Sequence, residues 1–196
     1  MAVTKSLLLA LIFAAIMILA SPTEESFITS SMVYIGPVTP GGENVTLEGS
    51  IQEIFHQILK LNPSYKQEDF HDTPDSHAHQ VGTNLEKRIP GDIICDPSGT
   101  KRAWRKHIEE GVAYLKRAPQ ASLCRVRNRA CSRISCSWDS GIFLCNDRDS
   151  WFEEFCPVLG NYADEILRGC QQSRTKVAGQ KFDPQNYNVL VKFDKC

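Results

Sequence analysis

Residues 133–145 read RISCSWDSGIFLC. Apolar residues alternate with polar ones from position 134 to 138, which is typical of a strand with one buried face. Residues 139–141 are the turn formers Asp-Ser-Gly, and the apolar run 142–145 follows them directly. The stretch therefore predicts a β-hairpin, and the signals on either side of it extend the same domain.

Strand and helix signals flank the hairpin on both sides. Residues 92–95 predict a short buried strand, and residues 187–193 predict a final one. Residues 100–117 place apolar side chains at helical spacing with Thr100 as the N-cap, and a second helical face runs from 158 to 170. The order β-α-β-β-α-β is the split βαβ arrangement. We therefore expect an α+β domain, a disulfide-stapled αβ sandwich with an antiparallel sheet of about four strands and two helices.

The cysteines are confined to this domain. Residues 1–88 contain none of the eight. An even set crowded into one segment predicts a framework of up to four disulfides, although the sequence does not choose their pairing. Paired CxxC knuckles are absent, so we expect neither a metal nor a cofactor. The disulfide-forming residues are Cys95, Cys124, Cys131, Cys136, Cys145, Cys156, Cys170 and Cys196.

The first 20 residues have the pattern of a secretory signal peptide. Lys5 precedes an apolar run, which ends at Ala20 just before Ser21 and Pro22. A membrane anchor is the alternative, but a run of roughly 15 apolar residues is shorter than the ~20 that span a bilayer. We therefore expect cleavage after Ala20 and a secreted, extracellular product.

A second cleavage site is predicted at the boundary of the cysteine-rich domain. Lys87 and Arg88 form a dibasic pair in a polar stretch before the first cysteine, as in kexin-type processing sites. An ordinary solvated pair is the alternative. Two further dibasic pairs, at 101–102 and 116–117, fall within the predicted helix, where a protease that needs an extended strand could not reach them.

Charge divides the chain at the same point. Residues 21–88 contain ten acidic and four basic residues, whereas residues 89–196 contain 13 acidic and 17 basic ones. We expect residues 21–88 to be an acidic pro-segment that masks or solubilises the basic mature domain, residues 89–196, until cleavage. The pro-segment is thus an expected partner of the mature domain.

One helix is predicted within the pro-segment. Ser50 and Glu53 have capping-box spacing, and apolar residues recur at helical intervals over residues 50–61. This amphipathic helix could dock on the mature domain or bind a membrane, but its acidic residues and few basic ones disfavour the membrane. Residues 62–86 are polar and rich in Asp, His and Pro, which predicts a disordered linker. Asn44 begins an Asn-Val-Thr sequon and predicts N-glycosylation.

A basic loop is the first candidate binding site. If the chain is extended after Cys124, then Arg125, Arg127 and Arg129 point to one side, and Arg133 follows on the next strand. Guanidinium groups in this arrangement could grip phosphate, sulfate or carboxylate groups of a target. A solvated basic loop is the alternative interpretation.

A second candidate site combines aromatic and polar residues. Trp138 and Trp151 could stack on a sugar ring, while Asn146 and Asp147 could form hydrogen bonds with its hydroxyl groups. Turn chemistry explains the Asn-Asp pair equally well. The two candidate sites thus point to an anionic target and to a glycan, respectively.

Catalysis has little support in the sequence. No GxSxG, HExxH or P-loop motif occurs. His107 is the only histidine after residue 88, and Glu110, three residues further on, could share its helical face. A solvated helix pair is the plainer interpretation. We therefore expect no catalytic residue, no nucleic-acid partner and a monomer.

The cysteine and strand pattern resembles the small cysteine-rich secreted proteins of fungi over roughly residues 93–196. The layout is similar to the killer toxins of smut fungi and the killer-toxin-like effectors of plant pathogens, which are αβ sandwiches with split βαβ units; several are released by dibasic processing. It is also similar to fungal glycan-binding proteins of mushroom type. This chain has eight cysteines, whereas the smut killer toxin pattern has more. The segments that carry the resemblance are Ile94-Cys95 and residues 133–138, 144–147, 167–170 and 179–196.

This resemblance implies a secreted, non-enzymatic effector or toxin-like protein that acts on the membrane or surface of another organism's cells. A secreted lectin-like glycan binder is the alternative. A secreted ribonuclease or other hydrolase is a second alternative.

Overall fold

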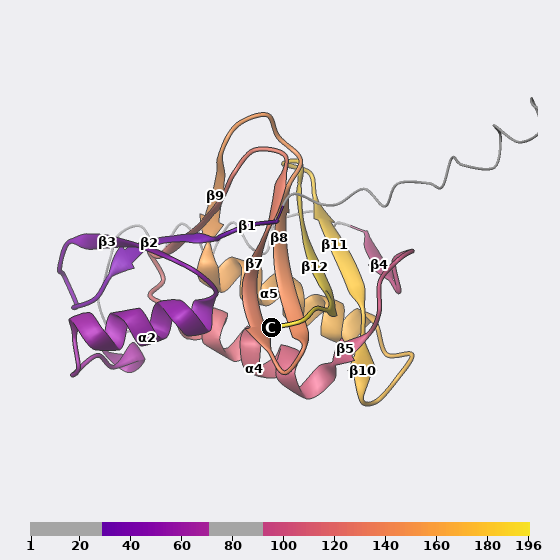
Figure 1. Cartoon of the computed structure of the whole chain (residues 1–196), viewed down its shortest axis with the longest axis horizontal. Coiled ribbons are helices and arrows are strands. Elements are labelled where there is room, and N and C mark those ends of the chain that lie inside the picture. The colour runs from indigo at the N-terminus through magenta and orange to yellow at the C-terminus, as the bar shows by residue number, and fades with distance from the viewer. Residues whose placement is uncertain (1–28, 71–91) are drawn as a thin grey trace, which may run out of the picture.

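The computed structural model describes residues 29–70 and 92–196 (Figure 1). Ala20, Lys87 and Arg88, with the predicted signal peptide, lie outside the described residues. The fold is α+β, as predicted. The helices of the described chain are α2 (Ile51–Leu61), α4 (Arg105–Arg117) and α5 (Cys156–Gly169), with a 3-10 helix η1 (Gln67–Phe70).

A six-stranded sheet forms the centre of the molecule. Its spatial order is β1-β7-β8-β12-β11-β4, and all neighbours are antiparallel except the short parallel pair β1–β7. The predicted order β-α-β-β-α-β is present as β4, α4, β7, β8, α5 and β12. The strands are β1 (Thr29–Ser30), β4 (Ile93–Cys95), β7 (Ala130–Ser137), β8 (Ser140–Asn146), β11 (Gly179–Asp183) and β12 (Tyr187–Phe193).

Strand β11 was not predicted, because its inward-facing side chains are polar. Lys181 and Asp183 are both buried, whereas Phe182 between them points outward. Lys181 pairs with Glu165 of α5, and the Tyr162 hydroxyl donates a hydrogen bond to Asp183. Because these charged residues have partners, the strand can be buried although it lacks the usual alternation of apolar and polar residues.

A second, four-stranded sheet is antiparallel throughout, in the order β3-β2-β6-β9. Two of its strands come from the predicted pro-segment and two from the cysteine-rich domain. A two-stranded ribbon of β5 (Ala103–Trp104) and β10 (Lys176–Val177) completes the described strands. The strands of the second sheet are β2 (Val33–Pro37), β3 (Asn44–Glu48), β6 (Leu123–Val126) and β9 (Phe152–Phe155).

Helix α4 begins at Arg105 and not at Thr100 as predicted. Thr100 instead closes a turn, because its hydroxyl donates a hydrogen bond to the Pro97 carbonyl. Arg102 then donates two hydrogen bonds to Asp96 ahead of the helix. The dibasic pair at 101–102 is therefore exposed and outside the helix, and the expected helical protection applies only to the pair at 116–117.

Helices α4 and α5 pack against each other and cover one face of the six-stranded sheet (Figure 1). Burying one large aliphatic side chain contributes about 1.5–3 kcal/mol. The layer between helices and sheet is thus the main hydrophobic core. Its fully buried aliphatic residues include Ile108, Leu115, Ile142, Leu144 and Ile166.

Four disulfides staple this core, which confirms the predicted framework. They hold β4 to the end of α5, β6 to the start of α5, β7 to β8, and β7 to the C-terminus. No cysteine is free. The pairs are Cys95–Cys170, Cys124–Cys156, Cys131–Cys145 and Cys136–Cys196.

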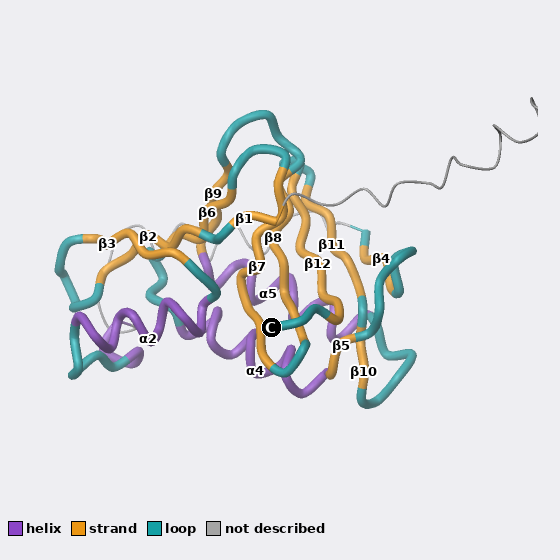
Figure 2. The backbone as a smooth tube through the Cα atoms, in the orientation of Figure 1, coloured by secondary structure: helices purple, strands orange, loops and turns teal. Residues whose placement is uncertain are grey.

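Residues 29–70, called the N-terminal segment below, are folded into the domain. Figure 2 shows β2, β3 and α2 along one side of the six-stranded sheet, opposite β4. The predicted helix is present as α2, and Ser50 and Glu53 form the predicted capping box. Asn44 is exposed at the start of β3, the edge strand of the smaller sheet.

The prediction of a disordered linker is wrong for residues 62–70. These residues form a turn and η1, and two aromatic side chains among them, Tyr65 and Phe70, are buried. Their ring centroids lie 5.1 Å apart, and Phe55 of α2 lies 6.0 Å from Tyr65. The polar composition of residues 62–70 gave no sign that these two aromatic side chains would be buried and would hold the segment against the domain. The rest of the predicted linker lies outside the described residues.

We predict that the capping box makes the fold sensitive to acid. The Ser50 backbone N–H and hydroxyl both donate hydrogen bonds to the Glu53 carboxylate, which lowers its pKa from 4.5. The stabilisation is present above the unfolded-state pKa and is lost as the pH falls through the lower folded-state pKa. Glu53→Gln should reduce the free energy of unfolding near neutral pH and weaken its decline below about pH 4.5.

Urea unfolding of the purified protein, measured over this pH range, tests the prediction. Glu43→Gln, on the exposed loop between β2 and β3, removes the same charge without touching the capping box and serves as the control. If both variants change the pH dependence equally, the capping box is not its source.

Candidate surface-binding site

Apart from Arg133, the predicted binding residues lie at two opposite ends of the hairpin β7–β8. The basic loop between β6 and β7 meets the loop between β8 and β9 at one end, which is the top of Figure 1. Trp138 lies at the other end, in the turn between β7 and β8. Asn146 is the last residue of β8, at the end of the strand away from Trp138, so the predicted sugar-binding residues do not form one cluster.

Two of the predicted arginines converge on a tryptophan at the loop end. The guanidinium carbons of Arg125 and Arg127 lie 4.8 and 5.6 Å from the ring centroid of Trp151. Trp151 is 42% exposed, so the cations and part of the ring face solvent together. The sequence placed these residues in two separate candidate sites. We call Arg125, Arg127, Arg129 and Trp151 the arginine–tryptophan site.

Asn146 holds the two loops in this arrangement. Its side chain is buried, and its Nδ2 donates hydrogen bonds to the carbonyls of Arg127 and Ser150, at 3.0 and 2.8 Å. Its Oδ1 accepts one from the Arg148 N–H. The Asp147 carboxylate accepts a hydrogen bond from the Asn188 amide. Asn146 therefore organises the loops and does not face a ligand.

Carboxylates neutralise part of the positive charge at this end. Arg129 has a left-handed backbone, with φ of 50°, and its Nε donates a 2.8 Å hydrogen bond to Asp149. This pairing lowers the pKa of the Asp149 carboxyl. Arg125 Nε lies 3.8 Å from the Glu153 carboxylate. Arg127 is exposed and makes no ion pair within the described residues, so its guanidinium is the one most open to an anionic ligand.

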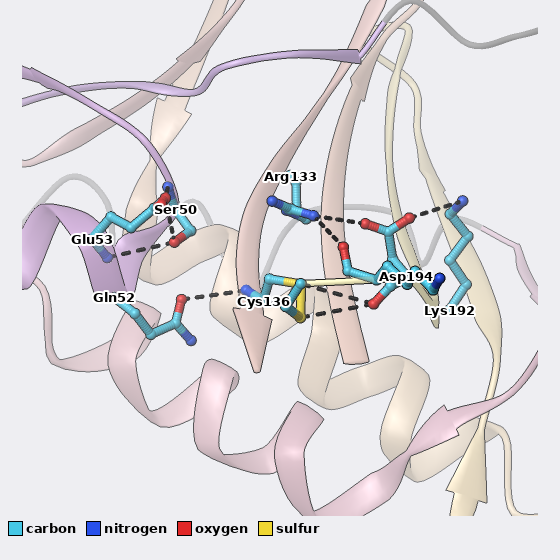
Figure 3. Close-up of polar contacts among 9 residues, drawn as sticks. Ser50, Gln52, Glu53, Arg133, Cys136, Lys192 and Asp194 are labelled. Carbon is cyan, nitrogen blue, oxygen red and sulfur yellow. Dashed lines mark hydrogen bonds and ion pairs between the residues drawn. A yellow bond between two sulfur atoms is a disulfide. The ribbon is translucent and has the colours of Figure 1, made fainter. Parts of the chain in front are cut away.

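Arg133 does not join this group. It lies on β7, where its Nη1 donates hydrogen bonds to the Asp194 carboxylate and the Lys195 carbonyl, at 2.9 and 2.8 Å. Figure 3 shows these bonds beside the disulfide between Cys136 and the C-terminal Cys196. The role that the structure gives Arg133 is to fix the end of the chain.

Among the large apolar side chains of residues 29–70 and 92–196, Trp138 is the most exposed, at 75%. Trp138 and Asp139 both have positive φ, 49° and 54°, as a two-residue hairpin turn of type I′ requires. A bulky residue rarely adopts this conformation. The Trp138 ring stacks on the imidazole of His107 in α4, with ring centroids 5.9 Å apart and an angle of 27° between the ring planes. One ring face is thus partly covered, while the side chain as a whole stays largely in solvent.

The predicted pairing of His107 with Glu110 is present. The His107 Nδ1 and the Glu110 carboxylate are 2.8 Å apart on the surface of α4. Among residues 29–70 and 92–196 no group of His, Cys, Asp and Glu side chains could hold a metal ion. His107 thus has a carboxylate on one side and an exposed tryptophan on the other.

None of the described helices is long and apolar enough to cross a membrane. Comparison of the chain with protein-family models, with curated proteins and with solved structures found no match. The surface chemistry of the two ends of the hairpin therefore carries the functional proposal.

We predict that Arg127→Ala lowers the salt concentration at which the protein elutes from immobilised heparin. The substitution removes an exposed guanidinium that could bind sulfate groups directly. Arg174→Ala removes the same charge from an exposed residue after α5 and should shift the elution less. Equal shifts would show that net charge alone governs binding, and would contradict a specific site.

Proposed function

We propose that this chain is the precursor of a secreted, non-enzymatic effector or killer-toxin-like protein that acts on the surface of another organism's cells. The observation that carries the proposal is the arginine–tryptophan site. Cell surfaces present phosphate, sulfate and carboxylate groups, and guanidinium forks bind these groups with matched geometry. Four disulfides are compatible with an extracellular protein.

A disulfide and buried hydrogen bonds hold the loops of the arginine–tryptophan site in place, which favours binding. The disulfide Cys131–Cys145 joins β7 to β8 at the base of the two loops, and Asn146 ties the loops to each other. Binding therefore costs little ordering of the backbone, because the loops are already in place. Cations held over Trp151 are also partly oriented before a ligand arrives.

A lectin-like glycan binder is the second candidate, and Trp138 favours it. An exposed tryptophan ring can stack on a sugar, and Asp139, His107 and Glu110 lie near enough to offer polar contacts. Asn146 and Asp147, the amide and carboxylate predicted for this role, lie at the opposite end of β8. In this second proposal the glycan site is centred on Trp138 alone.

The test compares binding to target cells and inhibition of their growth for the secreted protein and four single variants. Arg127→Ala should weaken cell binding and inhibition about tenfold, which corresponds to the loss of one charge-assisted contact. Trp138→Ala and the control Arg174→Ala should leave both nearly unchanged. If Arg127→Ala and Arg174→Ala behave alike, the arginine–tryptophan site is not the binding site.

The same four variants distinguish the effector from the lectin and from a hydrolase. Loss of binding in Trp138→Ala together with reversible binding to one glycan class would favour the lectin. Hydrolysis of RNA or polysaccharide that His107→Ala abolishes would favour an enzyme. Growth inhibition without either result favours the effector.

A further inference from the structure

The N-terminal segment covers strand edges of both large sheets. β2 pairs with β6 through Val33 opposite Arg125 and Ile35 opposite Leu123, and so closes the outer side of β6. β1 runs parallel to β7, with Ser30 opposite Ser132. Unpaired strand edges expose rows of backbone donors and acceptors that promote aggregation. The segment therefore does more than mask charge, because it completes both sheets.

Gln52 of α2 continues this cover along β7. The pairing of β7 with β8 shifts register between Arg133 and Ser135, directly before the β7 residues that Gln52 contacts. The Gln52 Nε2 donates a 2.8 Å hydrogen bond to the Ser135 hydroxyl, and its Oε1 accepts one from the Cys136 N–H at 3.3 Å. Figure 3 shows Gln52 reaching from α2 to Cys136.

The segment also supplies part of the common hydrophobic core. Met32, Tyr34 and Ile54 are fully buried, in the same cluster as the buried faces of α4 and α5. The ring centroids of Phe55 and Tyr114 of α4 lie 5.8 Å apart across the contact. A small pocket of about 10 Å³ lies between the segment and the end of α4, with room for about one water molecule.

Nothing covalent holds the segment in place apart from the chain itself. All eight cysteines lie in residues 95–196, and the four disulfides stay within that range. Phe70 packs on Tyr65, which itself contacts Phe55 of α2. Strand β4 lies at the opposite edge of the six-stranded sheet (Figure 1). A cut at Arg88 would therefore interrupt no element of the described fold.

We infer that, after cleavage at Arg88, residues 29–70 remain bound to residues 92–196 as a non-covalent second chain. The active form is then a two-chain protein rather than an isolated cysteine-rich domain. This inference rests on the proposed processing, but not on the target that the protein binds. Release of the segment would uncover the edges of β6 and β7 together with a large apolar surface, which water opposes.

The experiment cuts the purified, secreted chain and asks whether the two pieces stay together. A kexin-type protease, or a site-specific protease whose recognition sequence replaces Lys87–Arg88, makes the cut. Size-exclusion chromatography and native mass spectrometry at micromolar concentration should show one complex with one copy of each piece. In denaturant the pieces should separate without a reducing agent, because no disulfide joins them.

Matched variants localise the contact. After the cut, Ile54→Ala and Gln52→Ala should each release the segment at lower urea concentration than the unsubstituted protein. Leu61→Ala, on the exposed end of α2, should not. Each variant is first measured uncut, and elution at the volume of the unsubstituted chain shows that it folds. Separation of the cut pieces in buffer, with residues 92–196 still monomeric and folded, would overturn the inference, whether or not the protein binds cells.

Discussion

The pairing of β2 with β6 is the contact on which the arrangement of the whole molecule depends. β6 lies between β2 and β9, and β9 leads directly into α5, which is locked to β6 by Cys124–Cys156. The N-terminal segment thus completes a sheet whose other half carries the arginine loop, since Arg125 is paired in register with Val33. The stability of a segment predicted to be removable is therefore linked to the geometry of the candidate site.

Two kinds of constraint act on different parts of the chain. Disulfides hold residues 95–196 and reduce the conformational freedom of the unfolded state there. Residues 29–70 have no such help and depend on buried apolar side chains, strand pairing and the capping box of α2. Acid, denaturant and cleavage of the connecting chain should therefore act first on the N-terminal segment, whereas reducing agents act on the remainder.

Local patterns predicted the local structure well. The hairpin at 133–145, the strands at 92–95 and 187–193 and the capped helix after Ser50 are all present, because each is specified by side chains close in sequence. The buried polar strand β11 was missed, because its stabilising partners, Glu165 and Tyr162, lie on another element. For the same reason, no sequence pattern indicated that β2 pairs with β6 or that two aromatic side chains order residues 62–70.

The candidate site was only partly predictable. Alternation predicted that Arg125 and Arg127 share a side, but their approach to Trp151 depends on the pairing of β6 with β9 and on the buried Asn146. Trp138 and Trp151 were joined in one predicted site because both are aromatic, yet β8 keeps them at opposite ends. Residue type indicated the chemistry, whereas long-range register determined which groups act together.

Hydrogen exchange of the uncut chain, followed by mass spectrometry, is the most direct test of whether the pairing of β2 with β6 supports the fold. If it does, peptides covering 33–37 and 123–126 are protected to a similar degree and exchange together as denaturant is added. Rapid exchange throughout residues 29–70, with 123–126 and 130–146 still protected, would show that the N-terminal segment is dispensable for the fold and would contradict a supporting role for the β2–β6 pairing.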